Sequence, residues 1–112
     1  MKKFIILMPC YDDWTSIFRL LENIDKEILE LKGEFSVLIV NDGSNEKMPE
    51  TKSVYKNIKS VKVINMKKNQ GHTRSYATGI RYLSKKENYD YLILMDGDGE
   101  DRPEEIKLLV NK

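Results

Sequence analysis

Four short apolar runs stand out in a chain that is otherwise rich in charged residues. They are FIILM (4–8), VLIV (37–40), VKVINM (61–66) and YLILM (91–95). The first, second and fourth runs are continuous, which is typical of strands in a parallel sheet that is covered on both faces. The run at 61–66 alternates apolar with polar residues, as an edge strand does. The pattern therefore predicts four β-strands, with the third at an edge of the sheet.

The segment between the first two runs has helical periodicity. Residues 13–32 carry apolar side chains three and four positions apart, and Asp12 or Asp13 can cap the start of a helix. Gly33 can end it. The apolar positions are Ile17, Leu20, Leu21, Ile24, Ile28 and Leu31.

Two more helices are predicted towards the C-terminal end. Residues 72–86 place Tyr76, Ile80 and Leu83 on one face. Residues 103–111 begin with proline and two glutamates, which suit the first turn of a helix.

The segment 46–60 is ambiguous, with room for one short helix after Pro49. The element order is then β-α-β-(α)-β-α-β-α. This order predicts an α/β fold, a Rossmann-like, mostly parallel open sheet with helices on both faces in three layers. Ligands of such sheets bind beyond the carboxyl ends of the strands.

Polar residues follow each predicted strand at that edge. They occupy positions 9–13, 41–44, 67–72 and 96–101, and three of these four segments carry carboxylates. Because parallel strands all end at the same edge, the sequence predicts one site built from several loops.

The last of these segments suggests a metal site. If the chain stays extended, Asp96, Asp98 and Glu100 project to one side. Two carboxylates 4 Å apart repel by about 4 kcal/mol at an effective dielectric of about 20, so a cation would relieve the cluster. Oxygen ligands favour Mg²⁺ or Mn²⁺. An EF-hand loop is excluded, since Asp101 and Lys107 stand where it needs glycine and glutamate. Asp101 is expected to cap the next helix.

The other loops offer groups that suit a nucleotide. Asp42 can accept hydrogen bonds from a base or ribose, and Tyr11 can form a flat wall. Residues 69–74 open a helix whose amides suit a phosphate, and Arg74 can add charge-assisted contacts. His72 is expected to be a hydrogen-bonded bystander.

Composition narrows the class of protein. The 112 residues suggest one domain, and 19 basic against 18 acidic residues argue against nucleic acid as a partner. The single cysteine, Cys10, permits no intrachain disulfide. The apolar run at 4–8 is too short for a signal peptide, and no stretch approaches the roughly 20 apolar residues of a membrane span.

Four motifs in order resemble the N-terminal half of family 2 glycosyltransferases, which have the GT-A fold. The motifs are MPCYDD, LIVNDGS, NQGHTRSYATGI and MDGDGEDRPEEI. The last is similar to the D-x-D region of polyprenyl-phosphate glycosyltransferases such as dolichyl-phosphate mannose synthase. The sequence departs from the family pattern at Asp12 and Asp13, which replace Asn and Glu, and at Asn41, which replaces an Asp.

This resemblance implies strand order 3-2-1-4 and a nucleotide-diphospho-sugar donor held with Mg²⁺ or Mn²⁺. It also implies inversion at the sugar carbon, with a carboxylate base on the acceptor side. The implied donor-binding residues are Pro9, Tyr11, Asp13, Asp42, Gly71, Arg74 and Asp96, and the implied metal ligands are Asp96, Asp98 and Glu100.

The family's acceptor half would follow residue 112. We therefore expect residues 1–112 to form a single donor-binding domain, truncated before the acceptor half and inactive alone, and we assign no catalytic base. The acceptor stays open, and in the resembling branch it is lipid-linked. The intact protein is expected to be cytoplasmic, at the inner face of the membrane. An unpaired outer edge of the fourth strand favours strand addition, which makes a homodimer one predicted outcome.

Three other functions remain as alternatives. A non-catalytic module would bind the donor without turnover. A sugar nucleotidyltransferase usually has a Gly-rich, basic loop after the first strand, and MPCYDD is neither. A receiver domain, the least favoured, needs an acidic pair directly after the first strand, where residues 9–11 intervene, and a phosphoacceptor Asp where Lys67 stands.

Overall fold

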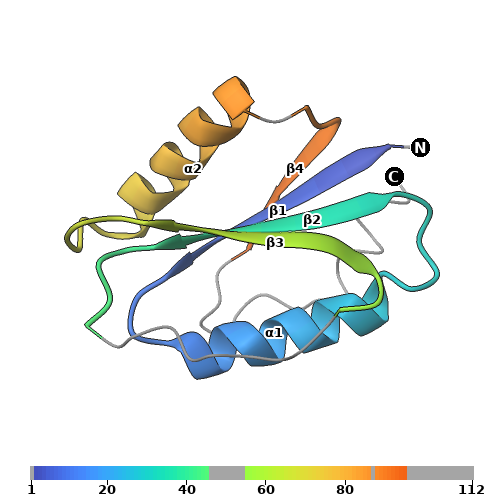
Figure 1. Ribbon diagram of the computed structural model, residues 1–112, viewed down its shortest axis with the longest axis horizontal. Helices are drawn as coiled ribbons and strands as arrows, with labels where there is room; N and C mark the ends of the chain where they lie inside the picture. Colours follow the sequence, from blue (N-terminus) through green and yellow to red (C-terminus); the bar gives the residue numbers. More distant parts are fainter. Residues whose placement is uncertain (1, 46–54, 87, 96–112) are drawn as a thin grey trace.

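The computed structural model describes residues 2–45, 55–86 and 88–95, which form one parallel sheet with a helix on each face (Figure 1). The elements are β1 (Lys3–Cys10), α1 (Trp14–Glu27), β2 (Glu34–Asn41), β3 (Ile58–Asn65), α2 (His72–Lys86) and β4 (Tyr91–Leu94). The strand order is β3-β2-β1-β4 and every neighbouring pair is parallel. The predicted fold class, layers and strand order are confirmed.

The continuous apolar runs of β1 and β2 follow from their central position. Every residue from 4 to 10 in β1 is buried, because the strand pairs with β2 on one side and β4 on the other and has a helix over each face. The larger core lies between the sheet and α1. It includes Ile6, Met8, Val37 and Ile39 of the strands and Trp14, Ile17, Leu21 and Ile24 of α1.

The second face of the sheet packs against α2 at very close range. Leu7 and Leu38 meet Leu83 there in a smaller apolar cluster. A Cβ atom added to Gly79 would overlap the Cδ1 atom of Leu7, which is fully buried. Glycine at this position therefore sets how near α2 can lie to β1.

Helix α1 is shorter than the sequence predicted. It ends at Glu27, and the chain continues through turns in which the amide of Leu31 donates to Ile28 O at 3.1 Å. Gly33 does not end the helix; it lies just before β2 with φ +151°, against the ring of Phe4. Asp13 occupies the N-cap position but makes no side-chain capping bond, so that part of the prediction is wrong.

Two apolar segments are more exposed than their sequence pattern indicates. Ile80 is 40% exposed, and the sheet-facing positions of α2 are Ser75, Gly79 and Leu83. The described residues do not cover both faces of β4, where Tyr91 and Leu94 are 47% and 49% exposed.

Some expected elements fall beyond what the structure describes. Residues 46–54 and the predicted helix at 103–111 lie outside the described residues, while β3 begins three residues earlier than its apolar run. Strand β4 pairs only with β1 among the described strands, and the homodimer through its outer edge stays a prediction. Neither α1 nor α2 is long and apolar enough to cross a membrane.

The close approach at Gly79 makes a testable prediction. Gly79→Ala should lower the free energy of unfolding by up to about 2 kcal/mol, because overpacking against Leu7, which costs about 1–3 kcal/mol, outweighs the gain of about 1 kcal/mol in helix propensity. Urea unfolding followed by circular dichroism measures this change. Thr73→Ala, at an exposed position of the same helix, should leave stability unchanged or slightly raised. A Gly79→Ala protein as stable as the parent would contradict the packing argument.

Candidate functional site

The loops that follow β1, β2 and β3 lie side by side at one end of the sheet (Figure 1). The amide of Asp42 donates to Cys10 O at 2.7 Å, and the amide of Met66 donates to Asn41 O at 2.9 Å. We call residues 10–13, 41–45 and 66–71 the carboxyl-edge cluster. The prediction that polar loops from separate strands converge at this edge is confirmed for these three loops.

Asp42 is the most deeply buried charged residue of the cluster, at 1% exposure. Its Oδ1 accepts a hydrogen bond from the Gln70 amide at 2.8 Å, and its Oδ2 accepts one from the Gly71 amide at 2.8 Å. Such short bonds to a carboxylate are charge-assisted and offset the cost of burying it. Asp42 thereby holds the loop that leads into α2, where helical amides otherwise need a capping partner.

Gly43 allows this loop to come close. Its φ is +68°, and a Cβ atom there would overlap the backbone of Lys68 and Asn69. A side chain would therefore meet both backbone strain and a steric clash, because left-handed φ values favour glycine. The Asp42-Gly43 pair thus acts as one unit, with the carboxylate binding the 69–71 loop and the glycine making room for it.

Asn41 and Ser44 link the remaining loops. The Asn41 Nδ2 donates to Asn65 Oδ1 at 3.0 Å, and the Asn41 Oδ1 accepts the Ser44 amide at 3.2 Å. The Ser44 Oγ accepts the amide of Asp12 at 2.9 Å, and the Asp12 Oδ2 accepts a bond from Asn45 Nδ2 at 3.4 Å. Asparagine at position 41, a departure from the resembling family, thus connects β2 to β3 and to its own turn.

Other predicted site residues stand at or beside this edge. Pro9 is buried at the end of β1, Tyr11 is 39% exposed, and Asp13 is half-buried at the start of α1. Gly71, with φ +91°, has open space where a Cβ would stand, and Arg74 is exposed in the first turn of α2. Their roles towards a nucleotide stay predictions.

The predicted metal ligands Asp96, Asp98 and Glu100 lie outside the described residues. Strand β4 runs parallel to β1, and the Met95 amide, directly before this segment, donates to Leu7 O at 3.0 Å. No group of three or more His, Cys, Asp or Glu side chains in the described part could hold a metal ion. The Mg²⁺ or Mn²⁺ site stays a prediction.

Burial also affects Cys10, at the end of β1. The thiol is 2% exposed, and this desolvation raises its pKa above the ordinary value although a backbone hydrogen bond from Asp13 opposes the shift. A thiol that is buried and protonated is a poor nucleophile. Cys10 therefore contributes to the buried core at the end of β1.

Sequence reasoning missed the link between Asn41 and Asn65, and also Ser75. Ser75 is fully buried and its hydroxyl donates to Gly71 O at 3.2 Å, which stiffens the start of α2. The asparagine link left a signal in the sequence, because β2 and β3 both end in Asn and the two residues are register partners.

Comparison with known families matches residues 5–112 to the family described as glycosyl transferase family 2. The chain belongs to this family. The parallel sheet in order β3-β2-β1-β4 agrees with the Rossmann-like half of its GT-A fold. Family membership favours a glycosyltransferase over the nucleotidyltransferase and receiver-domain alternatives.

Individual relatives are distant but cover nearly the whole chain. An uncharacterized glycosyltransferase of Synechocystis sp. is 28% identical over 108 residues, which are 96% of this chain and 33% of the relative. An undecaprenyl-phosphate 4-deoxy-4-formamido-L-arabinose transferase of Proteus mirabilis is 28% identical over 110 residues, 96% of this chain and 32% of the relative. An uncharacterized protein of Methanocaldococcus jannaschii is 25% identical over 112 residues, which cover 96% of this chain and 45% of the relative. The chain thus spans about a third to less than half of these relatives' length.

The buried carboxylate of Asp42 gives a second prediction. Asp42→Asn should lower the free energy of unfolding by about 1–3 kcal/mol, because the new side chain could accept only one of the two backbone bonds and would turn its own buried amide donor towards the other backbone N–H. Urea unfolding measures the loss, and hydrogen exchange should show faster exchange at the Gln70 and Gly71 amides.

Asp90→Asn is the matched control for this substitution. The Asp90 Oδ2 also accepts a backbone amide, that of Lys3 at 2.7 Å, but at an exposed position. Its loss should cost less than about 1 kcal/mol, since water can replace the carboxylate. Equal costs for the two substitutions would show that burial of Asp42 does not matter.

Proposed function

We propose that this domain binds a nucleotide-diphospho-sugar, with a divalent metal at the D-x-D motif, for an inverting glycosyltransferase. The observation that carries the proposal is the carboxyl-edge cluster of a family 2 domain, in which Asp42 holds the loop 69–71 through two backbone amides. Tyr11, which follows β1 at the same edge, is 39% exposed. This edge is where open α/β sheets bind ligands.

The base of the nucleotide is assigned to the β1 and β2 loops. Tyr11 offers an aromatic face on which a base can stack, and Pro9 and Asp13 stand two residues before and after it in the chain. Each oxygen of the Asp42 carboxylate can accept a further hydrogen bond. At 1% exposure, however, only a group that enters the carboxyl-edge cluster can reach the carboxylate. We assign it both roles: it holds the loop 69–71 and it borders the base pocket.

The diphosphate is assigned to the start of α2. Gly71 leaves open space there, Arg74 supplies a positive charge, and the amino end of a helix favours anions. Asp96, Asp98 and Glu100 would hold Mg²⁺ or Mn²⁺. When bound, that ion would stabilise the charge that develops on the leaving diphosphate.

The acceptor and the base that activates it belong to the whole protein. The Proteus mirabilis relative is named for transfer involving undecaprenyl phosphate, which supports a lipid-linked phosphate as the acceptor class. We propose that the whole protein works at the cytoplasmic face of a membrane, and that residues 1–112 form its donor domain, without turnover of their own. A module that binds the donor but has lost turnover is the second candidate.

Calorimetry of the chain with UDP, GDP and CDP, and with their sugars, in Mn²⁺, Mg²⁺ or EDTA, tests the proposal. One nucleotide should bind with metal, and EDTA or Asp98→Ala should weaken that binding at least about tenfold, because Asp98 would help to hold the ion that offsets the charge of the diphosphate. Asp90→Ala, which removes an exposed carboxylate near the opposite edge, should bind like the parent.

Binding of a nucleotide that neither EDTA nor Asp98→Ala weakens would contradict the metal assignment. No binding to the folded chain under any condition would contradict a donor site contained in these residues. Turnover by the full-length protein would separate the enzyme from the module that only binds.

A further inference from the structure

The side of α2 that is turned away from the sheet carries positive charge without negative charge (Figure 1). Its exposed positions recur at helical spacing, opposite the buried positions 75, 79 and 83. Residues 66–86 contain six basic residues and no acidic one, in a chain with 19 basic and 18 acidic residues. We call the exposed positions the outer α2 face; they are Thr73, Arg74, Ala77, Ile80, Arg81, Ser84 and Lys85.

The helix on the other face of the sheet has a different charge pattern. Helix α1 contains two basic residues, Arg19 and Lys26, and three acidic ones, Glu22, Asp25 and Glu27. The excess of positive charge is therefore a property of the α2 side of the molecule and not of its helices in general.

Neither the fold nor the proposed donor site accounts for two of the charges on the outer α2 face. Arg81 and Lys85 are four positions apart on one helix, where like charges repel. Within the described part of the chain, neither side chain pairs with a carboxylate. The diphosphate is assigned to Arg74, and Arg81 and Lys85 lie about 10 and 16 Å further along the helix axis. A separate anionic partner would offset their repulsion.

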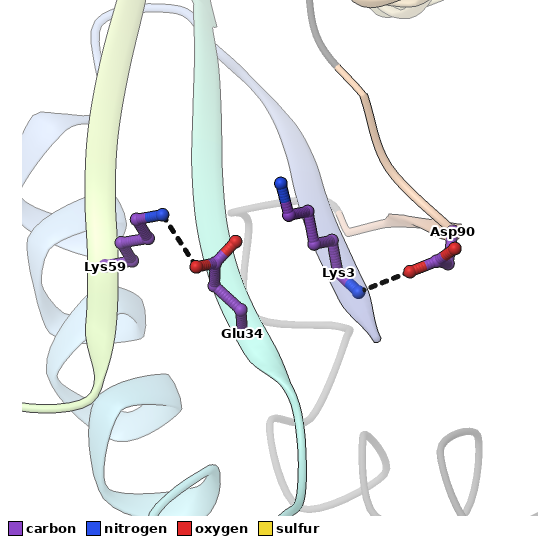
Figure 2. A network of polar contacts seen from close by, with 4 residues as sticks. All are labelled: Lys3, Glu34, Lys59 and Asp90. Atoms are coloured by element: carbon purple, nitrogen blue, oxygen red, sulfur yellow. Dashed lines mark hydrogen bonds and ion pairs between the residues drawn. The ribbon is translucent and has the colours of Figure 1, made fainter. Parts of the chain in front are cut away.

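The acidic groups at the amino ends of the strands do not reverse this charge balance (Figure 2). Glu34 Oε1 lies 2.6 Å from the Lys59 ammonium, so these two charges offset each other. Asp90 accepts the amide of Lys3 at 2.7 Å and contributes a negative charge. Even when the acidic residues up to Asp90 are counted, residues 66–90 have six basic residues against two acidic ones.

A membrane surface that contains anionic lipids suits the outer α2 face better than nucleic acid does. Ile80 belongs to this face and is 40% exposed. An apolar side chain can enter the headgroup layer of a bilayer, whereas it gains little from a nucleic-acid phosphate backbone. The basic positions from Arg74 to Lys85 also extend along about 16 Å of one straight helix, which matches a flat surface.

We propose that the outer α2 face binds the surface of a bilayer that contains anionic phospholipids, with Arg81 and Lys85 against the lipid phosphates and Ile80 in the headgroup layer. Each basic residue close to such a surface strengthens binding by about fivefold. This surface is separate from the proposed donor site, and it would give the proposed membrane location of the whole protein a physical basis.

Cosedimentation of the chain with lipid vesicles tests the proposal. The chain should bind vesicles of phosphatidylcholine mixed with phosphatidylglycerol at least about tenfold more tightly than vesicles of phosphatidylcholine alone, and added salt should weaken this binding by screening the charges. Arg81→Gln combined with Lys85→Gln should weaken binding to the mixed vesicles at least about tenfold. Ile80→Ser should weaken it about threefold at unchanged charge, because less apolar surface leaves water.

Arg19→Gln combined with Lys26→Gln is the matched control. It removes the same charge from exposed positions of α1, on the other face of the sheet, and should change vesicle binding by less than about twofold. NMR locates the contact, because lipids with a paramagnetic headgroup label should broaden the amide signals of Ala77 and Ile80 more than that of Asn23 in α1.

Three results would overturn the proposal. The first is no preference for the mixed vesicles. The second is an equal loss of binding in the two double variants, because attraction to net charge alone would then explain it. The third is binding to an oligonucleotide, but not to vesicles, that substitution of Arg81 and Lys85 weakens; this result would favour nucleic acid as the partner.

Calorimetry on the same proteins separates this surface from the proposed function. The variant at Arg81 and Lys85 should bind the nucleotide like the parent, because both positions lie well along α2 from the carboxyl edge. Binding to mixed vesicles without binding of any nucleotide would support the outer α2 face and contradict the donor site. Nucleotide binding without vesicle binding would contradict the outer α2 face alone.

Discussion

The buried carboxylate of Asp42 is the constraint on which the carboxyl edge depends. A carboxylate at 1% exposure is stable only if polar partners replace its water, and the amides of Gln70 and Gly71 do so. Those amides belong to the loop that begins α2, so the charge at the end of β2 also fixes where that helix starts. The amino end of α2, with its partial positive charge, is thereby directed at the edge where the polar loops converge.

The two ends of the sheet are organised by different interactions. At the carboxyl edge, hydrogen bonds among Asn41, Ser44 and Asp12 join the polar loops that follow β1 and β2. At the amino end, Phe35, Phe4 and Tyr91 are register partners on three adjacent strands and their rings stack, with centroids 4.7 and 5.1 Å apart. Apolar stacking therefore stabilises the amino end on the α1 side, whereas hydrogen bonds between polar groups hold the carboxyl edge together.

The sequence predicts the strands and their order well because both depend on apolar runs, which burial in a parallel sheet makes continuous. It predicts helix detail less well. Leu31 packs against the core from a turn, so helical spacing of apolar residues extended past the end of α1. The apolar spacing puts Ile80 on one face with Tyr76 and Leu83, yet the tight approach of α2 to Leu7 selects Gly79 and Ser75 for the buried face.

In the candidate site, too, the sequence predicts the overall arrangement better than the individual contacts. Which loops meet follows from the parallel topology alone, but the contacts of Asp42 do not, because its partners are backbone amides 28 and 29 residues away that carry no side-chain signal. Asn41 illustrates what the structure adds. An aspartate there would bring a second carboxylate next to a buried one, whereas the amide donates to Asn65 and accepts from Ser44. The asparagine therefore supports the link between β2 and β3 without adding negative charge beside Asp42.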